Sequence, residues 1–305
     1  MSTREREGFL WILAAAIGFA FIPTIVKTVY NHSNFEPLDL AVWRFILAAP
    51  LMWILVGLRS RSQGPSRGKG ISPIGSAFIG LLFAAAVLCA FFALQRLPGS
   101  TYVVLFFTYP AMIVLLSAFL GEAISPRAWL ALALALVGVG LTVPDFIVPD
   151  AVDPVGAILA LINAAIVAAY YLMARRVLAG VEDISRASAH MMGATLLILL
   201  LSLPVRGLQL PQNPATLVGL SCIATLGTVL PVFATNIAIQ RIGPARASLV
   251  STIEPVLAMI VAMILLGEVI VALQWLGAAL IVGSVVILQL GASDKVNINI
   301  AHEAG

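Results

Sequence analysis

Most of the chain consists of apolar stretches, each about 20 residues long, which is the length that an α-helix needs to cross a bilayer. Short segments that contain Gly, Pro, Asn and Ser separate these stretches. The stretches cover residues 8–29, 38–58, 74–95, 101–121, 127–144, 154–174, 186–204, 215–238, 245–266 and 270–290. Only 10% of the residues are charged, whereas a soluble domain contains about 25%. The sequence therefore predicts an all-α membrane protein with ten transmembrane helices and excludes a soluble globular fold.

A residue pattern occurs twice, about 145 positions apart, which indicates a duplicated unit. The matched positions are Gln95-Arg96 with Gln240-Arg241, Pro110 with Pro255, Gly121-Glu122 with Gly267-Glu268, and Trp129 with Trp275. We therefore expect residues 1–148 and 149–290 to form two five-helix repeats. Residues 291–305 form a polar tail, which we expect to be cytoplasmic and disordered.

The distribution of Lys and Arg predicts the orientation, because cytoplasmic loops of membrane proteins are rich in these residues. If the N-terminus is cytoplasmic, the loops on that side contain Arg4, Arg6, Arg59, Arg61, Arg67, Lys69, Arg127, Arg175, Arg176, Arg186, Arg241, Arg246 and Lys295. The loops on the opposite side contain only Lys27, Arg96 and Arg206. Both termini are therefore predicted to be cytoplasmic. Since each half has an odd number of helices, the two repeats are predicted to be inverted, as in many secondary carriers.

Two five-helix halves, with the Gly-Glu and Trp positions recurring after the fourth and ninth helices, resemble the EamA-type carriers of the drug/metabolite transporter (DMT) superfamily. Within that superfamily the chain is most similar to YddG-type exporters of aromatic amino acids. The resemblance covers residues 8–290. It implies a central cavity lined mainly by the first, third, fourth, sixth, eighth and ninth helices, with the fifth and tenth helices at the periphery. It also implies export across a bacterial inner membrane.

Two ionisable residues lie deep inside predicted helices, where a charge costs about 2.5–3.5 kcal/mol and normally faces protein or water. Glu254 directly precedes Pro255, where a helix loses a backbone hydrogen bond. Its carboxylate either binds a proton or a substrate ammonium group, or pairs with a basic residue or the freed backbone of a neighbouring segment. Arg44 is interpreted as a structural residue. The matched prolines, Pro110 and Pro255, are candidate flexing points for gating.

Aromatic side chains reach the middle of the fourth helix. Tyr102, Phe106 and Tyr109 share one helix face, which favours either a cavity wall or ordinary helix packing. The resemblance favours the cavity. Asn163 and Tyr170, seven residues apart, share a face of the sixth helix. The other candidate substrate-binding residues are Phe21, Thr24, Phe83, Phe92, Thr228 and Ser251.

These residues predict a transporter rather than an enzyme. Three His and two separated Cys form no metal or nucleophile motif, so we expect no cofactor and no metal. The candidate cavity has no cluster of basic residues for phosphate groups. We expect a monomeric secondary transporter that contacts membrane lipid, binds no nucleic acid and exports amino acids or similar small amphipathic metabolites by alternating access. The alternatives are a proton-coupled exporter of hydrophobic cations or drugs, and a channel or membrane scaffold.

Overall fold

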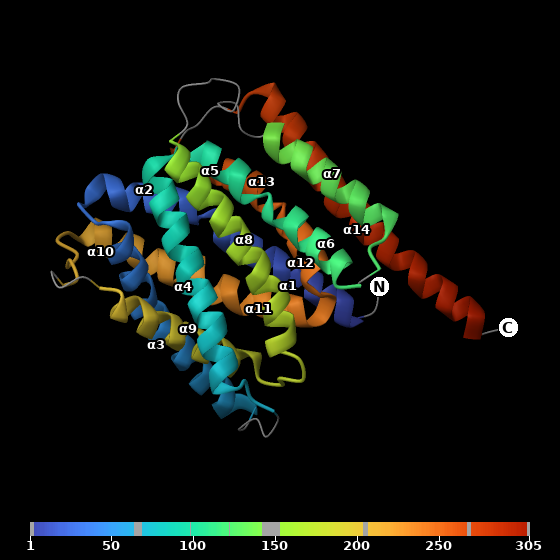
Figure 1. Ribbon diagram of the computed structural model, residues 1–305, viewed down its shortest axis with the longest axis horizontal. Coiled ribbons are helices and arrows are strands. Elements are labelled where there is room, and N and C mark those ends of the chain that lie inside the picture. Colours follow the sequence, from blue (N-terminus) through green and yellow to red (C-terminus); the bar gives the residue numbers. More distant parts are fainter. Residues whose placement is uncertain are drawn as a thin grey trace.

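The computed structural model describes residues 3–63, 69–97, 99–121, 123–141, 153–203, 207–266 and 270–303. The elements in these ranges are all helices, and they form an elongated bundle (Figure 1). The helical class that the apolar stretches predicted is therefore confirmed. The matched Gly-Glu pairs include Glu122, Gly267 and Glu268, which lie outside the described residues.

Within the described residues, eight helical stretches are long and apolar enough to cross a membrane. They are Thr3–Tyr30, Pro37–Leu58, Pro73–Arg96, Tyr102–Phe119, Pro154–Val177, Ile184–Leu201, Pro214–Ile242 and Pro244–Leu265. The predicted fifth and tenth spans correspond to shorter apolar helices, Pro126–Leu141 and Ala272–Ile287. Length and composition of the described residues therefore support eight of the ten predicted spans, and the fifth and tenth stay predictions.

Four of the spans are continuous helices, and polar caps start several of them. These helices are α3 (Pro37–Gln63), α4 (Pro73–Arg96), α8 (Pro154–Val177) and α9 (Ile184–Leu201). The Ser72 hydroxyl accepts a hydrogen bond from the backbone N–H of Gly75, and the Asp153 carboxylate accepts from Val155 and Gly156. Such caps satisfy N–H groups that have no partner within the helix. The position after the cap tolerates a proline, because an N–H there would also have no partner within the helix.

The other long spans are interrupted close to a proline. They are α1 (Thr3–Ala20) with α2 (Ile22–His32), α5 (Gly99–Phe106) with α6 (Tyr109–Phe119), α10 (Pro214–Ala224) with the π-helix η2 (Thr225–Val229) and α11 (Leu230–Ile242), and α12 (Pro244–Ser251) with α13 (Glu254–Leu266). Proline has no N–H to continue the helical hydrogen bonds, and its ring clashes with the carbonyl group four residues earlier. The prolines at these interruptions are Pro23, Pro110, Pro231 and Pro255. Pro50, by contrast, lies inside the continuous helix α3.

Helices α7 (Pro126–Leu141) and α14 (Ala272–Glu303) lie side by side along one edge of the molecule (Figure 1). Gly138 lets them approach closely, because an added Cβ would lie 2.8 Å from the Gly277 carbonyl oxygen. Helix α14 continues to Glu303, where the sequence led us to expect a disordered polar tail. After Gly291 the tail contains no proline or glycine before Glu303 that would stop a helix.

Ion pairs join the two halves at both ends of the bundle. At one end, Arg96, the last residue of α4, contacts Asp153 before α8, with 3.3 Å between Nη1 and Oδ2. At the other end, Arg241 in the last turn of α11 contacts Glu7 near the start of α1. Helix α1 begins at the end of the bundle that lies away from α2 and α5 (Figure 1). The two cysteines, Cys89 on α4 and Cys222 on α10, are partly buried free thiols.

Candidate functional site

A cavity with a volume of about 150 Å³ lies in the centre of the bundle. Its lining comes from α1, α2, α3, α4, α5, α6, α8, α11 and α13, and from the interruption between α5 and α6. Both halves of the chain therefore contribute to one site. The cavity suits a small molecule, and most of its surface is apolar.

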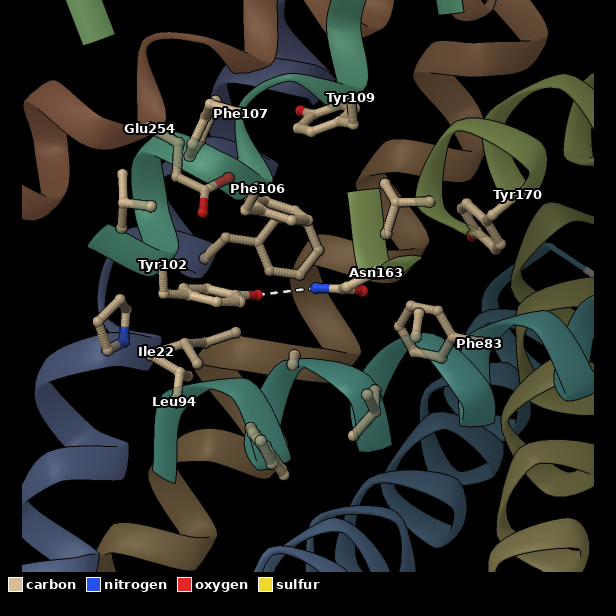
Figure 2. A pocket seen from close by; sticks show the side chains of 18 of the residues that line it. Ile22, Phe83, Leu94, Tyr102, Phe106, Phe107, Tyr109, Asn163, Tyr170 and Glu254 are labelled. Carbon is tan, nitrogen blue, oxygen red and sulfur yellow. Dashed lines mark hydrogen bonds between the residues drawn. The ribbon is translucent and has the colours of Figure 1, made fainter. Parts of the chain in front are cut away.

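Aromatic rings form a continuous row along the cavity. The row runs Tyr102, Phe106, Tyr109, Tyr171, Tyr170 and Phe83, and neighbouring ring centroids are 5.6, 5.0, 5.8, 6.0 and 5.5 Å apart. These separations are typical of favourable aromatic contacts. Figure 2 shows the Tyr102 and Phe106 rings on one wall and Phe83 and Tyr170 on another. The shared face of the fourth predicted helix thus lies on the cavity, although α5 ends at Phe106.

Hydrogen bonds fix the tyrosine hydroxyls in this row. The Asn163 side chain donates from Nδ2 to the Tyr102 hydroxyl at 2.8 Å (Figure 2). The Tyr170 hydroxyl donates to Asn236 Oδ1 at 2.7 Å, and Asn236 in turn donates to Ser188 at 2.9 Å. Buried polar groups need such partners. The bonds therefore tie α8 to α5 and α11, and α11 to α9, and they hold the rings in defined positions.

The interruptions in the two matched spans have the same local structure. The Thr108 hydroxyl donates to the Leu105 carbonyl at 2.7 Å, and the Thr252 hydroxyl donates to the Leu249 carbonyl at 2.6 Å. Each threonine bonds to the carbonyl three residues earlier, which tightens the chain before the proline. The interruptions bring Tyr109 and Glu254, the residues before the prolines, to the cavity. Pro110 and Pro255 themselves lie outside its lining.

Glu254 presents its carboxylate to the cavity. It points toward the rings of Phe106 and Tyr102 in Figure 2. In the part of the chain that the structure describes, this carboxylate has no hydrogen bond and no ion pair. Phe107 from the α5–α6 interruption and Val232 from α11 also line the site. The surroundings of the acid are therefore largely apolar.

Arg44 lies on the same cavity, where the sequence indicated only a structural residue. Its Nη2 donates to the Gly227 carbonyl at 2.9 Å, and its Nε donates to the Thr228 hydroxyl at 2.7 Å. Gly227 lies four residues before Pro231, which has no N–H to bond to that carbonyl. Arg44 thus replaces a hydrogen bond that the proline removes, and it also lines the cavity.

Seven of the predicted substrate-binding residues line the cavity: Phe83, Tyr102, Phe106, Tyr109, Asn163, Tyr170 and Glu254. The others, Phe21, Thr24, Phe92, Thr228 and Ser251, do not belong to its lining. Phe92 is 38% exposed on α4. The Ser251 hydroxyl lies behind the wall, where it donates to the Ala247 carbonyl and contacts the Tyr171 hydroxyl at 3.3 Å.

Sequence reasoning missed three polar residues of the lining as binding candidates, Arg44, Tyr171 and Thr235. Arg44 carried a signal, because an ionisable residue inside a membrane helix usually faces a functional site. Tyr171 follows Tyr170 directly, and the spacing from Asn163 placed only Tyr170 on the shared face. In the structure both tyrosines line the cavity and are 5% exposed.

Comparisons with known proteins agree with this architecture. A profile of the EamA-like transporter family matches residues 6–143 and again residues 154–290. An uncharacterized transporter of Synechocystis, sll1319, is 24% identical, with 95% of each chain covered. The uncharacterized inner membrane transporter YedA of Escherichia coli K12 is 25% identical, with 85% of this chain and 83% of the relative covered.

A solved crystal structure also has the same fold. It superimposes with a TM-score of 0.77 and 19% sequence identity, covering 94% of this chain and 98% of the other. The fold likeness and the two profile matches extend over nearly the whole chain. The chain therefore belongs to the EamA-like transporter family, and it is a multi-pass membrane transporter of the drug/metabolite superfamily.

Proposed function

We propose that this transporter exports amino acids, in particular aromatic and other apolar ones, across the inner membrane. The observation that carries the proposal is a central cavity with a row of aromatic rings, one acidic side chain and one basic side chain. An apolar amino-acid side chain suits the rings. Its polar head suits the charged groups, Glu254 and Arg44. A phosphorylated substrate would be expected to need several basic groups, and Arg44 is the one basic side chain that the described lining contains.

We also propose that residues 1–148 and 149–290 are inverted repeats, with both termini in the cytoplasm. The duplicated residue pattern, the two matches of the family profile and the distribution of Lys and Arg support this arrangement. Alternating access then opens the cavity first to one side and then to the other. The interruptions before Pro110 and Pro255 are the proposed flexing points, and a complete duplication within one chain supports function as a monomer.

Glu254 favours a second candidate function, the proton-coupled export of hydrophobic cations. An acid without an ion pair in the described part of an apolar cavity attracts cations and protons. Arg44 in the same lining opposes this candidate, because it repels a cationic substrate. We therefore rank amino-acid export first.

Counterflow in proteoliposomes tests the proposal. Purified protein is reconstituted into liposomes loaded with an excess of one unlabelled solute, and uptake of the same labelled solute is followed. The panel contains aromatic, aliphatic and polar amino acids and a hydrophobic cation, and protein-free liposomes are the control. We expect saturable counterflow of aromatic and aliphatic amino acids. Counterflow of the cation alone would favour the second candidate, and uptake without saturation would indicate a channel.

A further inference from the structure

We infer that the cavity recognises a zwitterion, with the substrate carboxylate bound by Arg44 and the substrate ammonium group bound by Glu254. This inference rests on the proposed transport of amino acids. It adds the two residues that recognise the charged ends, and it predicts weaker binding of analogues that carry only one charge. Arg44 comes from α3 in the first half of the chain and Glu254 from α13 in the second half.

Arg44 is a buried cation whose partners in the described structure are neutral. The residue is only 4% exposed, and its two hydrogen bonds go to a hydroxyl and a backbone carbonyl. The rings of Phe45 and Phe91 lie 5.7 and 5.9 Å from the guanidinium carbon, which adds a cation–π contribution. A guanidinium group has five N–H donors, and its planar fork matches a carboxylate. Donors therefore remain for a carboxylate in the cavity.

Glu254 is the opposite charge on the same lining. Its carboxylate faces the Phe106 and Tyr102 rings and has no hydrogen bond or ion pair among the described residues (Figure 2). An isolated carboxylate in such a setting is unfavourable, and ionisable residues inside a membrane normally pair or face water. A substrate ammonium group supplies the missing counter-charge and up to three N–H donors.

The two charges line one cavity, and no ion pair joins them in the described structure. A substrate with both charges neutralises Arg44 and Glu254 at the same time. A substrate that has only an ammonium group leaves Arg44 without a counter-charge. A substrate that has only a carboxylate leaves Glu254 without a counter-charge. In a medium of low dielectric constant this mismatch is costly. The lining is thus built to select a molecule with separated opposite charges and an apolar body.

Competition experiments on the wild-type transporter test the inference without any variant. The counterflow of labelled phenylalanine is measured against unlabelled phenylalanine, phenethylamine, which lacks the carboxylate, and 3-phenylpropionate, which lacks the ammonium group. We expect each singly charged analogue to compete at least about tenfold more weakly than phenylalanine, the effect of one lost hydrogen-bonded charge. Equal competition by all three would overturn the inference and leave amino-acid transport intact. No counterflow of any amino acid would overturn both proposals.

A matched pair of neutral variants then assigns the two ends. Arg44→Gln is expected to remove the preference for phenylalanine over phenethylamine, and Glu254→Gln the preference over 3-phenylpropionate. A purely structural role for either residue would weaken all three ligands alike and would overturn the assignment. Arg44→Lys keeps the charge and is expected to retain part of the discrimination against phenethylamine. Size-exclusion chromatography identifies variants that do not fold, and for these the wild-type competition decides.

Discussion

Two helix pairs join the halves of the molecule in equivalent ways and differ in the middle of the bundle. Helix α1 packs along α11, where an added Cβ at Gly8 would lie 2.6 Å from the Ile242 side chain. Helix α8 packs along α4, where an added Cβ at Gly156 would lie 2.8 Å from the Leu97 side chain. An Arg–carboxylate ion pair accompanies each contact. The ends of the two pairs therefore follow one plan.

Only one of the two pairs keeps continuous helices across the cavity. Helices α4 and α8 are unbroken and carry hydrogen-bonded tyrosines and Phe83. In the other pair both spans are interrupted. The span that contains α1 is interrupted at Phe21, and the span that contains α11 is interrupted at η2. Where α1 contacts η2, an added Cβ on Gly18 would lie 2.4 Å from the Leu226 carbonyl oxygen. From this comparison we expect α4 and α8 to act as a rigid wall and the backbone to change conformation at the α1–η2 contact.

Among the variants that test this difference between the two helix pairs, Gly18→Ala has the largest expected effect. The new methyl group would meet the backbone of η2 and the Pro231 ring, neither of which can turn away as a flexible side chain can. We expect a loss of about 1–3 kcal/mol of stability, seen as a lower Tm, together with slower counterflow. Gly57→Ala is the matched control, because nothing lies within 4 Å of a Cβ at that position of α3. Equal Tm values for the two variants would contradict the close contact.

The matched prolines, Pro110 and Pro255, provide a second test of how the interrupted spans differ from the continuous ones. Pro110→Ala and Pro255→Ala restore an N–H that can bond to the carbonyl four residues earlier, so each span is expected to become a straighter and stiffer helix. We expect both variants to slow counterflow several-fold with no decrease in Tm. Pro50→Ala in the continuous helix α3 is the control and should leave transport unchanged. Unchanged transport in both variants, with unchanged thiol access to both cavity mouths, would refute a gating role.

The ion pair at the α4–α8 end gives the smallest expected effect. Hydrogen bonds from the Gly156 N–H, the Arg96 side chain and the Val155 N–H lower the pKa of Asp153, which lies just outside its span. A lowered pKa in the folded state stabilises the fold above the ordinary Asp pKa, and this contribution disappears as the pH falls through the folded value. Asp153→Asn keeps the helix cap and removes the charge.

We therefore expect Asp153→Asn to lower the Tm slightly at pH 7. The difference from wild type should shrink below pH 3.8, the ordinary value for this carboxyl group. The difference in Tm is measured by thermal unfolding of both proteins from pH 7 to below pH 3.8. A difference that stays constant with pH would show that the charge of Asp153 makes no contribution.

The sequence predicted the helical class well, because spanning length and proline positions are local properties of the chain. It did not predict which side of each helix faces the cavity. Helix α4 is apolar on all sides, so the pattern of apolar residues marks no face. Phe83 and Phe92 were both chosen from it, but nine residues correspond to about 900° of rotation, which places them on opposite faces. Only Phe83 lines the cavity.

Other features depended on contacts between distant parts of the chain. The position of Arg44 on the cavity follows from its bonds to Gly227 and Thr228, which lie more than 180 residues later in the sequence. The π-helix η2 was not foreseen either, because Pro231 is compatible with several kinds of interruption. Tyr102, Phe106 and Tyr109 all line the cavity, but the helix is interrupted between Phe106 and Tyr109, so helical spacing alone does not explain their common position.

The position of the two cysteines has a practical consequence for spectroscopy. Cys89 lies on α4 in the continuous pair, and Cys222 lies on α10, three residues before η2. The natural cysteines therefore provide one attachment point for a spin label in the continuous helix α4 and one in the interrupted span that contains α10. The distribution of distances between the two labels would test directly whether the interrupted span moves relative to α4 during transport.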